Sequence, residues 1–446
     1  MKLLIAVCML LPFAAKAQTI IVKDADIESI VQQTSADSLQ TTIKILVAFG
    51  TRNTLSTQTN PVRGIGAARN WVYNKMKQYA TSNPNLSVVI DTVTIPANGK
   101  RVDRPILLGN VIATLKGTNP NDNRIFIISG HLDNMRTSPT DSIGDAPGAN
   151  DDASGVAAVL ESLRVLHKYS FGATILFVAM SGEEQGLLGA YYMSKKAKTQ
   201  NWNIEAMLNN DIMGSNNSND TKIINNTQVR IFSEGLPAYD TEKTAANIRT
   251  LGLENDGKAR QLARYVKEIG ERYVPNLEVK LVYRNDRFLR GGDHTPFVQQ
   301  GFAAVRITEM NENYTRQHQN VRVENGIQYG DLEQYIDYEY LRKNTALNAA
   351  NLANLAKAPP MPDSVIIEVA KLGNTTTLRW LSPKNNTVNG YYVLVRETTS
   401  AYWQQKHFTK NTQITLPYSK DNYYFAVQCV NSTYNESLAV VPIVGK

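Results

Sequence analysis

The feature that most constrains the fold is the alternation of short apolar runs with helical patterns over residues 18–357. Continuous apolar runs of this kind are typical of strands that are buried on both faces of a parallel sheet. The alternation therefore predicts an α/β fold, in which a mostly parallel sheet carries helices on both faces. We expect strands at 125–128, 174–180, 206–208, 229–232 and 303–307, and helices at 154–168, 186–196, 257–273, 294–300 and 331–356.

The pattern changes at a proline-rich segment, residues 358–362. Beyond it, short alternating runs separated by turn residues predict a small all-β sandwich. The proline-rich entry, Trp380 and the runs 390–393 and 424–427 resemble a fibronectin type III module. We therefore expect two folded domains, at 18–357 and 358–446, and the role of the second stays open. The expected strands of the sandwich are 365–369, 376–380, 391–395, 412–416 and 423–430.

The first residues, 1–17, have the features of a secretory signal peptide. Lys2 precedes a mostly apolar run at residues 3–15, and Ala15-Lys16-Ala17 is a small-x-small cleavage site. We expect cleavage before Gln18 and export of the mature protein to a periplasm or to the extracellular space. No later segment reaches the roughly 20 apolar residues that cross a bilayer, so we expect no membrane span.

Charge and cysteine content argue against two further classes of protein. The formal net charge is +7, but the basic residues are scattered, whereas nucleic-acid-binding proteins concentrate them in a patch. We therefore expect no nucleic-acid partner. After cleavage only Cys429 remains, which excludes a disulfide within the chain. Because Cys429 lies in the expected strand 423–430, we interpret it as a buried structural residue and not as a catalytic nucleophile.

Residues of the types that bind metals gather where the expected strands end. In an open α/β sheet, functional residues collect past the carboxyl ends of the strands. Singly, each has an ordinary explanation, since an Asp before a helix caps it and a pair of Glu residues is typical of a solvated helix start. Together they favour a metal site, because adjacent carboxylates after a buried strand are costly without a cation. The residues are His131, Asp133, Asp151, Asp152, Glu183, Glu184, Asp211 and His318.

This set of residues, with the glycine-flanked segment 148–155, resembles the secreted two-zinc aminopeptidases of the twenty-eighth metallopeptidase family. That family also contains glutamate carboxypeptidases, and the resemblance covers roughly residues 40–357. It implies a zinc-exopeptidase fold with two Zn²⁺ per chain. In that arrangement Asp151 bridges both ions, His131 and Asp211 complete one site, and Glu184 and His318 complete the other.

The same resemblance implies roles for two more residues. Glu183 would be the general base, and Asp133 would be the partner that fixes the tautomer and orientation of His131. It also implies a cis peptide bond between Asp151 and Asp152. The predicted function is therefore a secreted zinc-dependent exopeptidase, above all an aminopeptidase that hydrolyses the N-terminal peptide bond of peptides with a water bridged by two zinc ions.

Some assignments near the site stay open. His294 is the other candidate for the second histidine ligand, but the family takes that ligand from a later segment, after a Tyr, which favours His318. Arg322 stands where the family often has an acid, which leaves substrate preference open. Arg306 and Glu309, at the end of the expected strand 303–307, either line a specificity pocket or form an ion pair at the end of that strand.

Three other functions compete with an aminopeptidase. A carboxypeptidase of the same fold needs a cation for the terminal carboxylate of its substrate, and Arg306 or Arg322 could serve. A glutaminyl-cyclase-like enzyme binds a single zinc, and the complete set of five ligands argues against it. A secreted binding protein, with the sandwich as its working part, would be expected to lose Glu183 or a ligand first. The oligomeric state stays open.

Overall fold

The computed structural model describes residues 21–237, 242–370, 372–384 and 388–445. The predicted signal peptide, residues 1–17, lies outside the described residues. Among the described helices, none combines the length and the hydropathy that crossing a bilayer requires.

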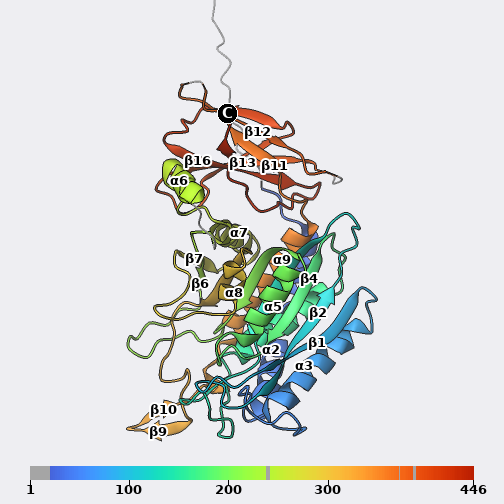
Figure 1. Ribbon diagram of the computed structural model, residues 1–446, viewed down its shortest axis with the longest axis vertical. Coiled ribbons are helices and arrows are strands. Elements are labelled where there is room, and N and C mark those ends of the chain that lie inside the picture. The colour runs from blue at the N-terminus through green and yellow to red at the C-terminus, as the bar shows by residue number, and fades with distance from the viewer. Residues whose placement is uncertain (1–20, 238–241, 371, 385–387, 446) are drawn as a thin grey trace, which may run out of the picture.

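An eight-stranded mixed sheet forms the centre of the larger part of the molecule (Figure 1). The four strands β4, β3, β5 and β8 run parallel to one another, as the apolar runs predict. The strands on either side add antiparallel pairs, so the sheet is less uniformly parallel than expected. In sheet order the strands are β1 (Leu86–Ile95), β2 (Ile106–Leu115), β4 (Thr174–Met180), β3 (Arg124–His131), β5 (Asn203–Asn210), β8 (Ala304–Glu309), β6 (Gln228–Phe232) and β7 (Glu278–Val282).

Helices cover both faces of this sheet, as expected. Buried apolar side chains of one face pack with α5 (Leu188–Thr199) and α8 (His294–Gln299). The opposite face forms the larger core with six helices, which means that most of the apolar burial lies on that side. The six are α1 (Ala25–Gln32), α2 (Ala36–Ala48), α3 (Gly64–Ala80), α4 (Ala153–Leu166), α7 (Lys258–Tyr273) and α9 (Tyr338–Lys357).

Helix α9 begins later than its pattern predicts. The expected helix starts at residue 331, but residues 333–335 form only a short 3-10 turn, η1 (Glu333–Tyr335), and α9 starts at Tyr338. The carboxylate of Asp337 accepts a hydrogen bond from the Tyr340 N–H at 3.0 Å and so caps the helix. This cap leaves Asp331 outside the helix, where it faces the candidate site described below.

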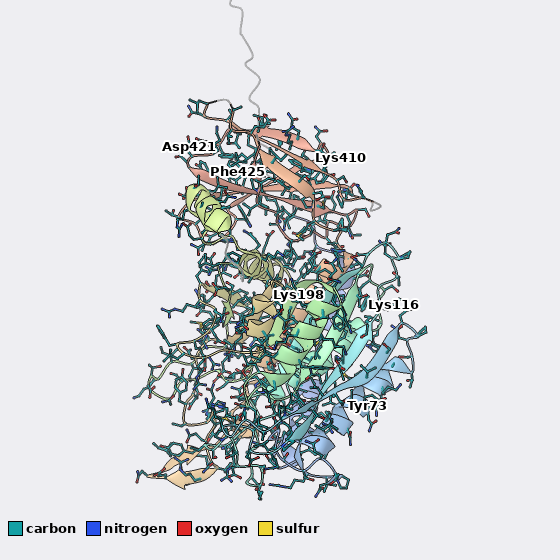
Figure 2. The ribbon with its side chains drawn as sticks, viewed as in Figure 1. Tyr73, Lys116, Lys198, Lys410, Asp421 and Phe425 are labelled. Carbon is teal, nitrogen blue, oxygen red and sulfur yellow. The ribbon has the colours of Figure 1, made fainter. Side chains whose placement is uncertain are left out.

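Two small β-sheets follow the helical region, in the order β15-β12-β11-β17 and β14-β13-β16. They enclose one apolar cluster that includes Trp380, Tyr391 and Phe425. Phe425 is labelled among the C-terminal strands in Figure 2. Cys429 is buried in that cluster as expected, and burial raises the pKa of its thiol above the ordinary value. The strands are β11 (Asp363–Ile367), β12 (Thr376–Leu381), β13 (Gly390–Glu397), β14 (Gln405–Thr409), β15 (Gln413–Leu416), β16 (Tyr423–Val430) and β17 (Ile443–Val444).

These C-terminal sheets lie at one end of the molecule, beyond α7 (Figure 1). The segment that leads into them lies at the amino ends of the central strands, since Arg124 at the start of β3 donates hydrogen bonds to the carbonyls of Ala358 and Pro359. A hairpin of β9 (Arg322–Glu324) and β10 (Ile327–Tyr329) lies at the opposite end, and α6 (Glu242–Leu251) lies beside the C-terminal sheets. The carboxyl edge of the parallel strands is therefore free to build a site.

Candidate metal centre

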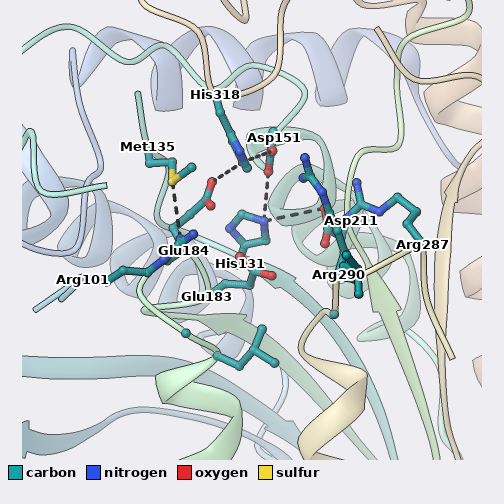
Figure 3. A pocket seen from close by; sticks show the side chains of 14 residues that line it. Arg101, His131, Met135, Asp151, Glu183, Glu184, Asp211, Arg287, Arg290 and His318 are labelled. Atoms are coloured by element: carbon teal, nitrogen blue, oxygen red, sulfur yellow. Dashed lines mark hydrogen bonds and ion pairs between the residues drawn. The ribbon is translucent and has the colours of Figure 1, made fainter. Parts of the chain in front are cut away.

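The predicted metal-binding residues meet at the carboxyl edge of the parallel strands. His131 is the last residue of β3, Glu183 and Glu184 follow β4, and Asp211 follows β5. Together with Asp151 and His318 they line one cavity of about 370 Å³ (Figure 3). None of the 14 residues that line this cavity comes from the C-terminal sheets.

Two groups of possible ligands share Asp151. The first is His131, Asp151 and Asp211, and the second is Asp151, Glu184 and His318. Within each group the potential ligand atoms lie within 4.8 Å of one another. One carboxylate oxygen of Asp151 lies 3.1 Å from His131 Nε2, and the other lies 3.0 Å from His318 Nε2. The arrangement allows Asp151 to contribute one oxygen to each of two neighbouring metal sites.

The donor atoms fit zinc. Imidazole nitrogen together with carboxylate oxygen is the ligand mixture found in catalytic zinc sites. Glu184 Oε1 is buried and accepts no hydrogen bond from any described residue, although it lies 3.1 Å from His318 Nε2. A buried carboxylate oxygen without a donor is costly, and a cation in the second group would satisfy it.

The electrostatics of the site reflect crowded carboxylates. Burial alone would lower the pKa of His131, but Asp152 and Glu183 outweigh it and raise that pKa well above the ordinary value. Burial raises the pKa of Glu183 well above its usual range, His131 opposes the shift, and Glu184 adds to it. Several acids thus share a small volume, which is the condition that bound cations relieve.

Asp133 contacts His131 through its main chain. The carbonyl oxygen of Asp133 lies 3.0 Å from His131 Nδ1, while its nearer carboxylate oxygen is 3.9 Å from that nitrogen. An Nδ1–H donated to this carbonyl would leave Nε2 free to bind a metal. The carboxylate of Asp133 has a different task, because it accepts hydrogen bonds from the N–H groups of Gly182, Glu183 and Glu184 at 2.8, 3.2 and 3.1 Å. It thereby holds the turn that carries both glutamates.

Asp152 is a helix cap, the ordinary explanation for an acid at this position. Its side chain accepts a hydrogen bond from the Gly155 N–H at 2.8 Å at the start of α4. It also accepts one from the His131 N–H at 2.9 Å and so ties α4 to the end of β3. The peptide bond between Asp151 and Asp152 is cis, as the family resemblance implies.

Two buried residues that the sequence did not single out support the site. Asp331 accepts hydrogen bonds from the N–H groups of Asn150 and Asp151, the latter at 2.7 Å, across 180 positions of sequence. Burial raises the pKa of Asp331 to about 7. Arg52, 1% exposed, donates to the carbonyls of Leu132, Leu46, Pro147 and Gly148, and so ties together the segments that follow His131 and precede Asp151. Neither residue has a local pattern, since Asp331 and Arg52 make most of these hydrogen bonds with partners 80 or more positions away in the chain.

The open assignments near the site have distinct outcomes. His294 belongs to neither ligand group; its Nε2 lies 2.8 Å from the carbonyl oxygen of Asn285. Arg306 and Glu309 are fully buried and do not line the cavity. Arg306 forms ion pairs, but its partners are Asp211 at 3.1 Å and Asp286 at 2.9 Å.

Glu309 and Arg322 likewise have their partners outside the cavity. Glu309 accepts hydrogen bonds from Asn150 Nδ2 at 2.9 Å and from the Ser215 N–H at 2.6 Å. Arg322 pairs with Glu324 at the exposed hairpin and does not line the cavity. The cavity therefore takes its specificity from residues other than Arg306, Glu309 and Arg322.

Comparison with known proteins points to the same chemistry. The model of Peptidase family M28 matches residues 110–339. The chain is 41% identical over 424 residues to a probable zinc metalloprotease of Leptosphaeria maculans, covering 95% of this chain and 98% of the relative. It is 39% identical over 427 residues to a probable zinc metalloprotease of Pyrenophora tritici-repentis, covering 94% and 98%. Both matches extend into the C-terminal sheets.

Solved structures share the fold at low sequence identity. LapB from Legionella pneumophila has a TM-score of 0.53 at 18% identity, with 74% of each chain covered. An aminopeptidase from Aneurinibacillus sp. strain AM-1 has a TM-score of 0.50 at 16% identity, covering 74% of this chain and 95% of that one. At this identity the likeness extends to the fold, a large α/β sheet with covering helices.

Proposed function

This chain belongs to peptidase family M28 and is a zinc metalloprotease, and on that premise we propose that it is an exopeptidase that removes the N-terminal residue from peptides. The observation that carries the proposal is the pair of ligand groups joined by Asp151 inside one small cavity. A carboxylate that offers one oxygen to each group is the arrangement expected of a two-metal hydrolytic site.

The residues that would hold the zinc ions follow from the two groups. His131 and Asp211 would hold one ion, Glu184 and His318 would hold the other, and Asp151 would contact both. When bound, the ions supply Lewis-acid chemistry, which lowers the pKa of a water and polarises the scissile carbonyl. Arg306, buried outside the cavity lining, holds Asp211 in place through an ion pair at 3.1 Å.

Glu183 is the residue we assign to proton transfer. It lines the cavity next to Glu184, and its own N–H is held by the Asp133 carboxylate, so its position is set by the same turn that presents the ligand. As general base it accepts a proton from the attacking water, and as general acid it then donates that proton to the leaving amine. Of the two adjacent carboxylates, Glu183 thereby transfers the proton and Glu184 would bind a metal ion.

The size of the cavity supports action on a chain end. A volume of about 370 Å³ is at the lower limit of ligand pockets and suits one or two residues better than an extended segment of chain. The fold likeness to an aminopeptidase from Aneurinibacillus agrees with this choice.

We also propose that the enzyme acts outside the cytoplasm. The proposal rests on the charged start, the apolar run at 3–15 and the small-x-small site before Gln18. Edman sequencing of the protein recovered from outside the cytoplasm checks this, and a mature chain that retains residues 1–17 would refute it.

The decisive experiment combines metal content with one isosteric substitution. Protein stripped with a chelator is titrated with zinc, and zinc per chain is measured by elemental mass spectrometry for the wild type, Glu183→Gln and the control Glu339→Gln. We expect two zinc ions in each protein and a loss of about 100-fold or more in kcat for Glu183→Gln only, since general acid–base catalysis contributes about 10²–10⁴-fold. Glu339 is an exposed residue that pairs with Arg342 on α9.

The outcomes separate the parts of the proposal. A panel of aminoacyl anilides and N-blocked peptides provides the substrates, and hydrolysis of unblocked substrates alone supports an aminopeptidase. Retained activity in Glu183→Gln would refute its assignment as the base. A plateau at one zinc per chain would refute the shared site at Asp151.

A further inference from the structure

The mouth of the metal cavity carries arginine side chains, two of which form no ion pair with any described acid. Three arginines line the cavity, Arg101, Arg287 and Arg290 (Figure 3). Arg287 is occupied, because its guanidinium pairs with Glu312 at 2.7 Å and with Asp286 at 3.3 Å. The other two arginines have no carboxylate partner among the described residues.

The two unpaired arginines approach the cavity from separate loops. Arg101 belongs to the connection between β1 and β2, and its guanidinium contacts the carbonyl of Glu184 and, at 3.8 Å, the sulfur of Met135. Arg290 belongs to the loop between β7 and α8, and its guanidinium makes no hydrogen bond or ion pair with any described residue. In Figure 3, Arg101 lies on the Glu184 side of the cavity and Arg290 lies on the Asp211 side.

A count of charges shows what the two arginines add. The acids that line the cavity are Asp151, Glu183, Glu184 and Asp211. The inference rests on the proposed function, in which two zinc ions bring four positive charges that balance these four carboxylates. Arg101 and Arg290 then leave the mouth positive, and a positive cleft concentrates negative ligands.

The remaining lining does not favour a large apolar residue. Only Met135, Leu187 and Leu289 among the 14 lining residues have apolar side chains, and Leu289 is fully exposed at the rim. A guanidinium, by contrast, matches a carboxylate with two parallel hydrogen bonds. The chemistry of the lining is thus that of an acid-binding pocket.

We propose that Arg101 and Arg290 make this enzyme select substrates that carry a carboxylate close to the scissile bond. The carboxylate comes from one of two sources, the acidic side chain of the first residue or the C-terminal carboxylate of a dipeptide. In either case the arginines are specificity-determining residues. They bind the carboxylate of an acidic substrate both in the ground state and in the transition state, and they have no part in proton transfer.

The test uses substrate pairs that differ only in one charge. Glutamyl and glutaminyl anilides compare the side chain, and leucyl-glycine and its C-terminal amide compare the terminal carboxylate. The variants are Arg101→Gln and Arg290→Gln, with Lys100→Gln and Arg284→Gln as controls from the same loops, since neither control residue lines the cavity. We expect the wild type to have a higher kcat/KM for the charged member of one pair than for the neutral member. In the variant that lacks the responsible arginine, the ratio of these two kcat/KM values should fall by about tenfold or more.

A binding measurement makes the result independent of turnover. Isothermal titration calorimetry of the same pairs with the zinc-loaded Glu183→Gln protein, with and without each arginine substitution, reports discrimination as a ratio of Kd. A fall in the glutamyl ratio identifies a side-chain subsite, and a fall in the leucyl-glycine ratio identifies a subsite for the chain end.

The failures of the two proposals are distinguishable. Hydrolysis of all substrates without charge preference, or a preference unchanged in both arginine variants, would overturn the inference and leave the exopeptidase intact. Absence of hydrolysis together with arginine-dependent binding of acidic ligands would overturn the exopeptidase and retain the acid-binding pocket. Equal effects of the control variants would show a general loss of positive charge and would also overturn the inference.

Discussion

Substitution of Glu436 by glutamine should lower the free energy of unfolding by about 3 kcal/mol. Glu436 is fully buried where the C-terminal sheets meet α7. Its carboxylate pairs with Arg272 of α7 at 2.5 Å and with Lys406 of β14 at 3.1 Å. Its main-chain carbonyl accepts a hydrogen bond from the Tyr265 hydroxyl at 2.9 Å. One side chain thereby links the C-terminal sheets to the helices that cover the large sheet.

Two independent considerations set the magnitude. Burial would raise the pKa of Glu436, but Lys406 and Arg272 outweigh it and lower that pKa to about 2 from the ordinary 4.5. A lowering of the Glu436 pKa by this amount corresponds to about 3 kcal/mol in the free energy of unfolding at neutral pH. Breaking a buried pair costs about 3–5 kcal/mol, and the lower end applies because Glu268 remains as a partner for both cations.

The sign of the pH dependence follows from the direction of the shift. Since the folded-state pKa is depressed, the stabilisation is complete above about pH 4.5 and is lost as the pH falls toward about 2. Urea unfolding followed by tryptophan fluorescence at several pH values between about 7 and 3.5 gives the difference between wild type and Glu436→Gln. That difference should narrow below about pH 4.5.

A matched control distinguishes the loss of the buried ion pair from the loss of a negative charge as such. Glu368→Gln removes an exposed carboxylate that lies 3.9 Å from Arg379 in the same sheets, and it should change stability by less than about 1 kcal/mol. A loss under about 1 kcal/mol for Glu436→Gln at neutral pH, or a loss that stays constant into acid, would refute the reasoning.

Three further predictions concern the metal centre and the free thiol. Asp331→Asn should weaken zinc binding by about 10–100-fold, because the carboxylate that receives the Asp151 N–H loses its charge; competition with a chelator measures this, and an affinity equal to that of the exposed control Asp363→Asn would contradict it. Removal of zinc should lower the Tm, because the site acids then repel one another without a cation; scanning calorimetry of stripped and reloaded protein checks this, and equal Tm values would contradict it. Cys429 should react with thiol reagents only after unfolding, since it is buried and burial raises its pKa; labelling of the native protein at the rate of the unfolded chain would show the opposite.

Local pattern was enough to find the centre of the fold. The apolar runs at 125–128 and 174–180 predict β3 and β4, because strands buried on both faces need apolar residues at every position. Strand β1 was missed, since at the edge of the sheet only Leu86 and Val88 are buried and its other residues are exposed or partly buried. Helices α1 and α2 were also missed, although Asp24 and Ser35 cap them with local hydrogen bonds that sequence reading could have used.

Local pattern likewise predicted some residues of the candidate site and not others. His131, Glu184 and Asp211 were recognisable because each lies at or within a few residues of the carboxyl end of a strand. The carboxyl ends of parallel strands meet at one edge of the sheet whatever the loops do. Asp331 and Arg52 do not lie at the end of a parallel strand, so this rule does not identify them. Their roles come from partners 180 and 80 or more positions away, and the loops that bring them together have no periodic pattern.

The sequence by itself determined which segments become buried strands and which residue types follow them, because burial on a strand leaves a local apolar pattern. The tertiary structure alone decided that Asp133 holds the turn at 182–184 and that Glu436 anchors the C-terminal sheets. It also decided that Arg101 and Arg290 lie at the mouth of the cavity without a carboxylate partner among the described residues. Those contacts depend on where distant loops meet. The sequence around a charged residue or a hydrogen-bond donor does not show which distant residue it will contact.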